Sequence, residues 1–362
     1  MSNAPPAAGR LVSLDVFRGL TIAAMILVNN PGDSSTTYPQ LLHAEWHGWT
    51  FTDLVFPFFL WIVGVAMTFS FAKRVERGEN RGKLLLHIVR RSALIFGLGL
   101  LLNGFPYYNL STLRIPGVLQ RIAICYLIAA VIFLYTGLRG RIAWLTGFLL
   151  AYTVMMHPGG YEKDSNFAGY VDGLFLSGHM WSRTKTWDPE GIISTLPSIS
   201  TVLFGVLTGM LLRSRAAAAE KTAWMFFSGN MLVWLGLIAG CWQPINKMIW
   251  TPSYVFFTAG MALVVFGSCY WLVDVSGWRW WSKPFVIYGM NAITVYVLSG
   301  LLARSLMLWK AGGSIMRQII YERAFVPLAS PVNASLLWAL ANVAVIYAAA
   351  WIMYRRGWFV KL

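Results

Sequence analysis

The sequence contains few charged residues. Only 12% of its 362 residues are Asp, Glu, Lys or Arg, whereas an ordinary soluble domain contains about a quarter. Hydrophobic residues make up 57% of the chain and aromatic residues 15%. A chain of this composition lacks the polar surface of a water-soluble globule, so that class of protein is excluded.

Cysteine is also scarce. The three cysteines, Cys125, Cys241 and Cys269, lie in apolar stretches without paired spacing, so we expect neither a disulfide framework nor a metal site. The first ten residues, MSNAPPAAGR, contain no apolar core and no cleavage site. We therefore expect no removable signal peptide, and the first membrane helix itself should direct insertion.

Long apolar runs make up most of the chain. Nine stretches without Asp, Glu, Lys or Arg have about the length of a membrane span, and they cover residues 54–72, 92–113, 122–138, 142–161, 191–212, 222–246, 248–273, 284–303 and 324–354. A tenth, at about 14–30, begins with the charged residues Asp15 and Arg18. The sequence therefore predicts an all-α, polytopic membrane protein with about ten transmembrane helices in a single domain, residues 1–362.

The basic residues lie between these runs and give the chain a net charge of +15. This pattern does not fit a nucleic-acid partner, which needs a basic face interleaved with aromatic residues. With the N-terminus in the cytoplasm, the cytoplasmic segments hold 19 of the 29 Lys and Arg residues, as the positive-inside rule requires. We predict that both termini are cytoplasmic, with 1–13 as a tail, and that 157–190 and 304–333 are extracytoplasmic loops.

A short segment after the first span combines an amide, imidazoles and a carboxylate. Asn29 is followed by His43, His47 and, within the next apolar run, Asp53. A carboxylate in an apolar run needs a partner, and His43 is the candidate. An imidazole fixed by a carboxylate, with an amide donor nearby, is typical of an acyl-transfer site. His47 is interpreted as a residue of the membrane interface.

Other polar residues interrupt the spans. Asp15 and Arg18 share one helix face, so they either orient the helix as an ion pair or leave Arg18 to hold an anionic group in a cavity. Arg121 lies within a predicted span and must pair or line a cavity. Asn291 lies in the middle of another span and needs a hydrogen-bond partner.

The order of these motifs resembles one known family. The runs RLVSLDVFRG, VN at 28–29, HAEWHGWTFTDLVFPFFLWIVG at 43–64, RIPGVLQRIAICY at 114–126 and GMNAITVYV at 289–297 are similar to the heparan-alpha-glucosaminide N-acetyltransferase family, including bacterial homologues. The resemblance implies a transmembrane acyltransferase of the bacterial inner membrane. It would move an acetyl group from cytosolic acetyl-CoA to a glucosamine-like amino sugar on the periplasmic side.

The resemblance also implies roles for individual residues. His43 matches the catalytic histidine and Asn29 the supporting asparagine, although this chain carries a few more residues between the two; Asp53 would orient the imidazole. For acetyl-CoA binding we assign Arg18, Arg114, Gln120, Arg121 and Asn291. Because the large lumenal domain of animal members has no counterpart in the sequence, the expected acceptor is a free amino sugar or a cell-wall fragment.

Several alternatives stay open. An amino-sugar transporter would also place polar residues at membrane depth, although no duplicated halves are visible in the sequence. The aromatic and polar residues of 157–190 suit sugar contact, but they also suit an aromatic belt. A direct transfer and an acetyl-histidine intermediate cannot be separated by sequence. Membrane lipid, and a second copy of the chain in a homodimer, are candidate partners.

Overall fold

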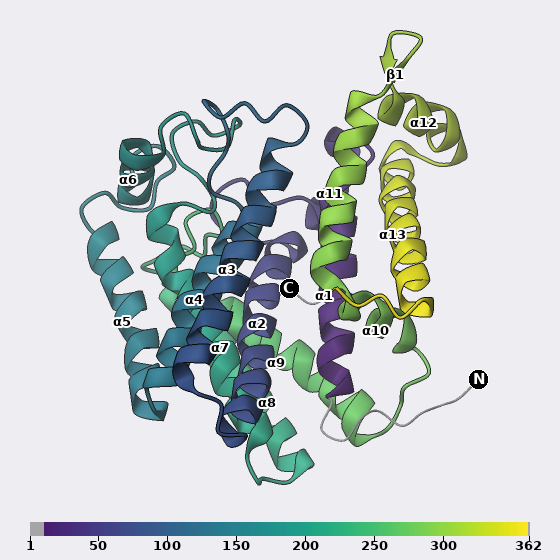
Figure 1. Cartoon of the computed structure of the whole chain (residues 1–362). Helices are drawn as coiled ribbons and strands as arrows, with labels where there is room; N and C mark the ends of the chain where they lie inside the picture. The colour runs from purple at the N-terminus through teal and green to yellow at the C-terminus, as the bar shows by residue number, and fades with distance from the viewer. Residues whose placement is uncertain (1–10, 361–362) are drawn as a thin grey trace. The chain divides into compact units, whose positions relative to one another are not determined.

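The structure is a computed structural model that describes residues 11–360, and these residues are almost entirely helical (Figure 1). The helices are α1 (Val12–Asn29), α2 (Phe51–Glu76), α3 (Arg81–Gly104), α4 (Val118–Tyr135), α5 (Leu138–Met156), α6 (Phe167–Leu176), α7 (Ile192–Arg213), α8 (Ala218–Ala239), α9 (Pro252–Tyr270), α10 (Lys283–Met290), α11 (Ala292–Leu308), α12 (Met316–Ala324) and α13 (Pro331–Arg355). A π-helical turn, Trp271–Val275, extends α9. The tail predicted for 1–13 lies mostly outside the described residues.

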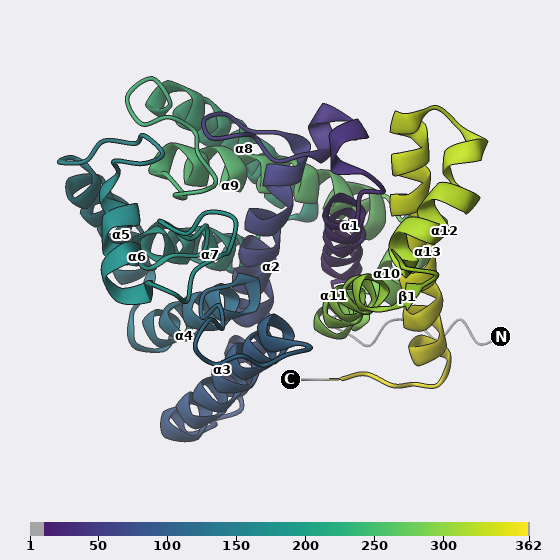
Figure 2. The same cartoon turned by 90° about the horizontal axis from the view of Figure 1, so that it is seen from above.

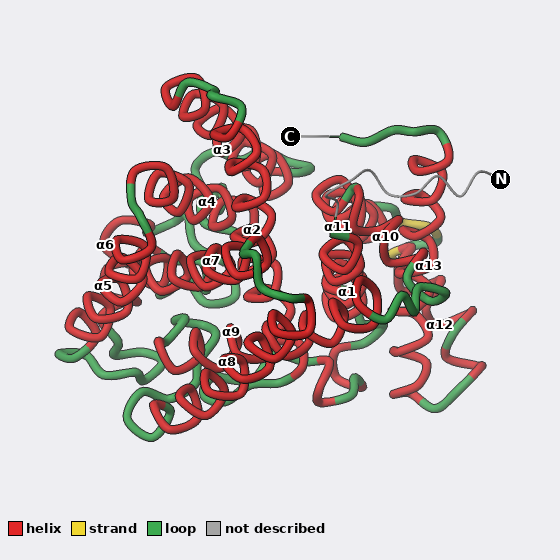
Figure 3. The backbone as a smooth tube through the Cα atoms, turned by 90° about the horizontal axis from the view of Figure 1, so that it is seen from below, coloured by secondary structure: helices red, strands yellow, loops and turns green. Residues whose placement is uncertain are grey.

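Sheet structure is limited to one short hairpin. Strands β1 (Lys310–Ala311) and β2 (Ser314–Ile315) pair antiparallel, with Lys310 opposite Ile315 (Figure 3). The hairpin and α12 occupy the predicted loop 304–333, and α6 lies in the predicted loop 157–190. Both long loops therefore contain secondary structure, as their length suggested.

The membrane-spanning character of the fold is confirmed. Eight helices among the described residues are long and apolar enough to cross a membrane, and the bent pair α10 and α11 makes nine. The tenth expected span, α5, is helical but is not one of these nine, because Arg139 and Arg141 in its first turn reduce its mean hydropathy. Eight or nine spans agree with the prediction of about ten, and the orientation of the termini stays a prediction.

The described chain divides into two compact units. The central unit contains His43–Arg215 and Phe227–Ala262. The terminal unit contains the chain up to Leu42, Ala216–Phe226 and the chain from Leu263 onward. The single domain expected over residues 1–362 stays a prediction.

The central unit is built around α7, which contacts α2, α4, α5 and α6 (Figure 2). Its closest packing joins α7 to α2 through two glycines. A methyl group on Gly64 would lie 2.0 Å from the carbonyl oxygen of Val202, and one on Gly205 would lie 2.0 Å from that of Trp61. The two backbones are therefore in direct contact, an arrangement that small residues allow in membrane helices.

The terminal unit packs α1 against α10, α11 and α13. A methyl group on Gly19 of α1 would overlap the carbonyl oxygen of Phe285, at 1.8 Å. The next helix pair, α10 and α11, is bent by 83° at Asn291. The amide of Asn291 donates to the carbonyl of Trp358 (3.0 Å) and accepts from the N–H of Val360 (3.1 Å). Asn291 thus has the partner that its burial requires.

Candidate active site

His43 and Asp53 of the central unit form a hydrogen-bonded pair. Thr50 and Asp53 make a capping box at the start of α2, in which the N–H of Thr50 donates to Asp53 Oδ2 (3.0 Å). The N–H of Ala44 donates to the same oxygen (3.0 Å), which leaves Oδ1 for His43 Nδ1 at 2.6 Å. The carboxylate of Asp53 is fully buried, whereas 39% of the His43 side chain is exposed. The predicted pairing is confirmed.

The Asp53 contact defines the state of the imidazole. When Nδ1–H of His43 donates to Asp53, the lone pair of the neutral ring lies on Nε2. Burial and the positive charge of Lys247 lower the pKa of His43, against the opposite effects of Asp53 and Glu190. A neutral imidazole that carries its lone pair on Nε2 has the form of a general base.

Lys247 is a member of this cluster that our reading of the sequence missed. Its Nζ lies 3.2 Å from both Nδ1 and Nε2 of His43. It comes from the short connection between α8 and α9, which the sequence places outside the membrane. A signal was available: Lys247 is the only charge between two apolar runs, 222–246 and 248–273, on the side that should be poor in basic residues.

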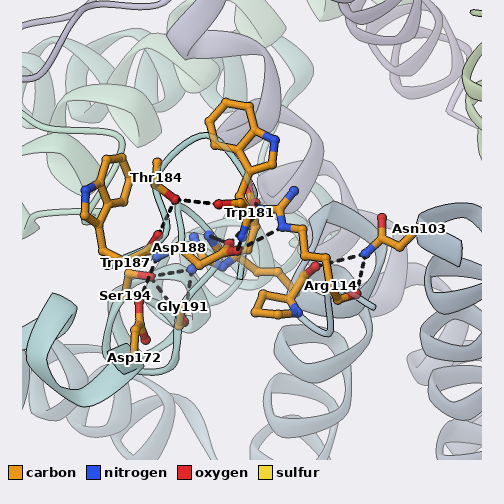
Figure 4. Close-up of polar contacts among 12 residues, drawn as sticks. Asn103, Arg114, Asp172, Trp181, Thr184, Trp187, Asp188, Gly191 and Ser194 are labelled. Atoms are coloured by element: carbon orange, nitrogen blue, oxygen red, sulfur yellow. Dashed lines mark hydrogen bonds and ion pairs between the residues drawn. The ribbon is translucent and has the colours of Figure 1, made fainter. Parts of the chain in front are cut away.

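Arg114 ties the start of α4 to the segment 157–190 (Figure 4). Its Nε donates to Asp188 Oδ2 (2.9 Å), and its Nη2 donates to Asp188 Oδ1 (2.6 Å) and Glu190 Oε2 (2.6 Å). Burial lowers the pKa of Arg114, but the two carboxylates outweigh it and the pKa is raised overall. The guanidinium therefore has a fixed charge and position.

Arg121 lies deeper, with only 1% of its surface exposed. Its Nη2 donates to the carbonyl of Gly191 (3.2 Å) and to the hydroxyl of Ser194, and its guanidinium lies 5.2 Å from the ring centre of Trp250. Among residues 11–360, Nε and Nη1 of Arg121 have no hydrogen-bond partner. Arg121 is thus a buried cation with remaining donor capacity.

Asp172 of α6 binds the turn at 188–192, which also contains the partners of Arg114. Its carboxylate accepts from the N–H groups of Ile192 (2.9 Å) and Asp188 (3.1 Å). Burial raises its pKa to about 6. A methyl group on Gly191 would lie 2.0 Å from Asp172 Oδ2, so only glycine fits there.

Aromatic side chains link the segment 157–190 to the segment that carries His43. The indole N–H of Trp46 donates to the carbonyl of Tyr161 (2.9 Å), and the rings of Trp46 and Trp187 meet edge to face with centroids 5.1 Å apart. His47 accepts from the amide of Asn246 (3.3 Å). The structure therefore brings the predicted sugar-contact segment and the histidine segment together.

The remaining predicted residues have different surroundings. Gln120 is buried on α4, where its amide packs against Gly99 of α3. In the terminal unit, Arg18 donates to Asp15 (3.2 Å), as expected, and to the carbonyl of Gly289 (3.3 Å). Asn29 ends α1 with an exposed side chain. The proposed roles of Gln120, Arg18 and Asn29 in binding or catalysis stay predictions, as does that of Asn291.

Comparison with known proteins adds a second line of evidence. A family model described as "Heparan-alpha-glucosaminide N-acetyltransferase, catalytic" matches residues 10–240. The heparan-alpha-glucosaminide N-acetyltransferase of Homo sapiens is 31% identical over 360 residues, covering 82% of this chain and 53% of the human protein. The protein of that name from Mus musculus is 31% identical over 353 residues, covering 80% and 53%. The chain spans about half the length of these curated relatives.

Proposed function

Because the chain belongs to the heparan-alpha-glucosaminide N-acetyltransferase family, we propose that it is a membrane acetyltransferase. It moves the acetyl group of acetyl-CoA to the amine of a glucosamine-like sugar. The observation that carries this proposal is the His43–Asp53 pair, in which a buried carboxylate lies 2.6 Å from a partly exposed imidazole. The eight apolar helices support a membrane location, and we place the protein in a bacterial inner membrane.

The chemistry follows from the state of His43. Nε2 accepts a proton from the sugar amine as the nitrogen attacks the thioester carbonyl. Asp53 holds the ring and stabilises the imidazolium, which then gives its proton to the departing CoA thiolate. Asn29 is our candidate donor to the oxyanion, because an amide N–H can stabilise that charge. An acetyl group carried on His43 is the alternative route.

Donor and acceptor are proposed to reach the site from opposite sides of the membrane. We assign acetyl-CoA to the cytoplasmic side, with Arg18, Gln120, Arg121 and Asn291 as candidate contacts. The carboxylates that bind the Arg114 guanidinium, Asp188 and Glu190, lie at the end of the segment 157–190. Arg114, also assigned to acetyl-CoA from the sequence, is therefore proposed to support the acceptor side. The acceptor is a free amino sugar or a cell-wall-derived fragment.

The direct test is CoA release by the purified protein in detergent. With acetyl-CoA we expect release in the presence of glucosamine, and none with N-acetylglucosamine, which has the same ring and a blocked amine. Incubation with acetyl-CoA alone, followed by peptide mass spectrometry, distinguishes an acetyl group on His43 from direct transfer. Uptake of labelled glucosamine into proteoliposomes without acetyl-CoA, together with no CoA release, would instead support the transporter.

A further inference from the structure

Lys247, in the connection between α8 and α9, contacts His43 of the His43–Asp53 pair. Its Nζ lies within 3.2 Å of each ring nitrogen of His43, whose Nδ1 is also 2.6 Å from Asp53. The three side chains therefore share one cluster, although Lys247 is 204 residues from His43 in the sequence. A long, flexible side chain makes such a contact reproducibly only when its backbone is held in place.

The backbone around Lys247 is held by a dense set of hydrogen bonds. The fully buried side chain of Asn246 accepts from the N–H of Ile249 (3.2 Å), and the backbone N–H of Asn246 donates to the hydroxyl of Thr251 (3.1 Å). The N–H of Gly48 donates to the carbonyl of Ile245 (2.7 Å), and the Asn246 amide reaches His47 (3.3 Å). These last two contacts attach the lysine-bearing turn directly to the segment that carries His43.

Charges of both signs act on His43 from the elements packed around it. Asp53 of α2 and Glu190 at the end of 157–190 favour the protonated ring, whereas Lys247 favours the neutral ring. Burial lowers the pKa of Lys247 itself, and Arg121 and Arg114 act in the same direction, whereas Asp53 and Glu190 raise it and so favour the charged amine. Without Lys247, the balance at His43 would move towards the imidazolium, which has no lone pair with which to accept a proton.

We propose that Lys247 is a positioning residue of the acetyl-transfer site, whose amine fixes the imidazole of His43 against Asp53 and keeps it unprotonated until the acceptor amine arrives. This inference rests on the proposed function. After proton transfer the imidazolium lies next to Lys247, and the repulsion between the two cations favours release of the proton to the leaving thiolate. Lys247 thus acts on both halves of the proton transfer without contacting the acetyl group.

Two substitutions test this role. Lys247→Met keeps an unbranched side chain that is one atom shorter and removes its charge, whereas Lys247→Arg retains the charge. We expect the acid limb of the kcat/KM profile to move up by about one pH unit in Lys247→Met, so that the loss of activity is greater at acidic than at alkaline pH. Lys247→Arg should keep the wild-type limb, as should Lys163→Met, which alters an exposed lysine of the segment 157–190.

A readout independent of acetyl transfer separates this inference from the proposed function. Diethyl pyrocarbonate acylates only unprotonated imidazole, so its pH-dependent reaction at His43, measured by peptide mass spectrometry, reports the state of the ring. In Lys247→Met the reaction should need a higher pH than in the wild type and in Lys247→Arg. An unchanged profile in Lys247→Met overturns the role of Lys247. If Lys247→Met shifts the pH profile of this reaction but the wild type releases no CoA, the role of Lys247 at His43 stands and only the proposed acetyl transfer is contradicted.

Discussion

Asp53 serves two purposes with one carboxylate. Oδ2 accepts from the N–H groups of Ala44 and Thr50 at 3.0 Å and so begins α2, while Oδ1 holds His43. Its backbone carbonyl in addition accepts from the hydroxyl of Tyr254 on α9. Because these contacts fix both the carboxylate and the backbone of Asp53, the orientation of His43 is set by the start of a helix and not by a mobile loop.

The two neighbouring histidines provide a matched pair of substitutions. His43→Ala should reduce acetylation by about a hundredfold to ten-thousandfold, with acetyl-CoA binding retained, because the base is lost and the fold is not. His47→Ala loses the hydrogen bond from Asn246 and a 3.7 Å contact with the exposed Glu162. It retains the bond from Gly48 to Ile245, which holds the Lys247 turn to this segment, and should keep most of the activity. CoA release and the binding of labelled acetyl-CoA measure the two effects. Near-normal turnover in His43→Ala would remove His43 from the mechanism.

The sequence predicted the local part of this site but not the distant part. His43 and Asp53 are ten residues apart, and a buried acid beside a helix start has few partners within reach. Lys247 reaches the same ring only through the turn at Asn246, and Asp188 and Glu190 reach Arg114 from more than seventy residues away. Contacts of this kind depend on tertiary packing, which no local pattern encodes.

At the scale of elements, the segment 157–190 is held in place by contacts with parts of the chain on either side of it in the sequence. Asp172 from α6 and Arg114 from the start of α4 hold the same turn, which includes Asp188. Arg121 donates to the next residues, Gly191 and Ser194. Three elements therefore converge where α7 begins, and the turn that carries Glu190 is fixed by charge as well as by packing.

Removal of Arg114 should loosen this turn. Arg114→Met leaves Asp188 and Glu190 as buried carboxylates without their cation, which typically destabilises a protein by about 3–5 kcal/mol. Arg183→Met is the control, because Arg183 lies over the same Trp181 ring (5.6 Å) but is exposed. Thermal unfolding in detergent should show a clear decrease for Arg114→Met only. Equal melting temperatures would show that the ion pairs are dispensable.

Asp172 should give this turn a pH-dependent stability. Burial raises its pKa to about 6 from 3.8, so between these values the folded protein keeps a proton that the unfolded chain has lost. The free energy of unfolding therefore falls as the pH rises through this range and is higher below it. Asp172→Asn lacks the ionisation. The melting temperature of the wild type relative to Asp172→Asn should rise as the pH is lowered from about 7 to 5; parallel curves would contradict the assignment.

For the molecule as a whole, the pattern of charge predicted which segments are helical better than it predicted where each helix begins and ends. The membrane spans were confirmed in eight helices and one bent pair, but α2 continues past Lys73 to Glu76, and α3 begins at Arg81, before the apolar run at 92. A run without charge reports only the part of a helix inside hydrocarbon. The bend at Asn291 was not predicted, and the contact that Asn291 makes there with Trp358 joins residues far apart in the sequence, which no local pattern encodes.

Topology can be tested by cysteine labelling. Cys241 is the exposed native cysteine, so Cys241→Ser gives a background in which Cys125 and Cys269 are buried. In this background, Tyr170→Cys on α6, a position that is 67% exposed, should react with an impermeant maleimide in intact spheroplasts. Arg77→Cys should react only after the membrane is opened. The reverse pattern would invert the predicted orientation and remove the two-sided mechanism.

The glycine contact between α2 and α7 fixes the angle at which the two helices cross. Asp53 lies eleven residues from Gly64 along α2, or about 16 Å at 1.5 Å per residue, and the turn at Gly191 lies at the start of α7. A single added methyl at Gly205 would overlap the backbone at Trp61 and force the helices to pivot. A small change of the crossing angle at Gly205 would therefore give a larger displacement at the starts of α2 and α7, close to His43 and Glu190.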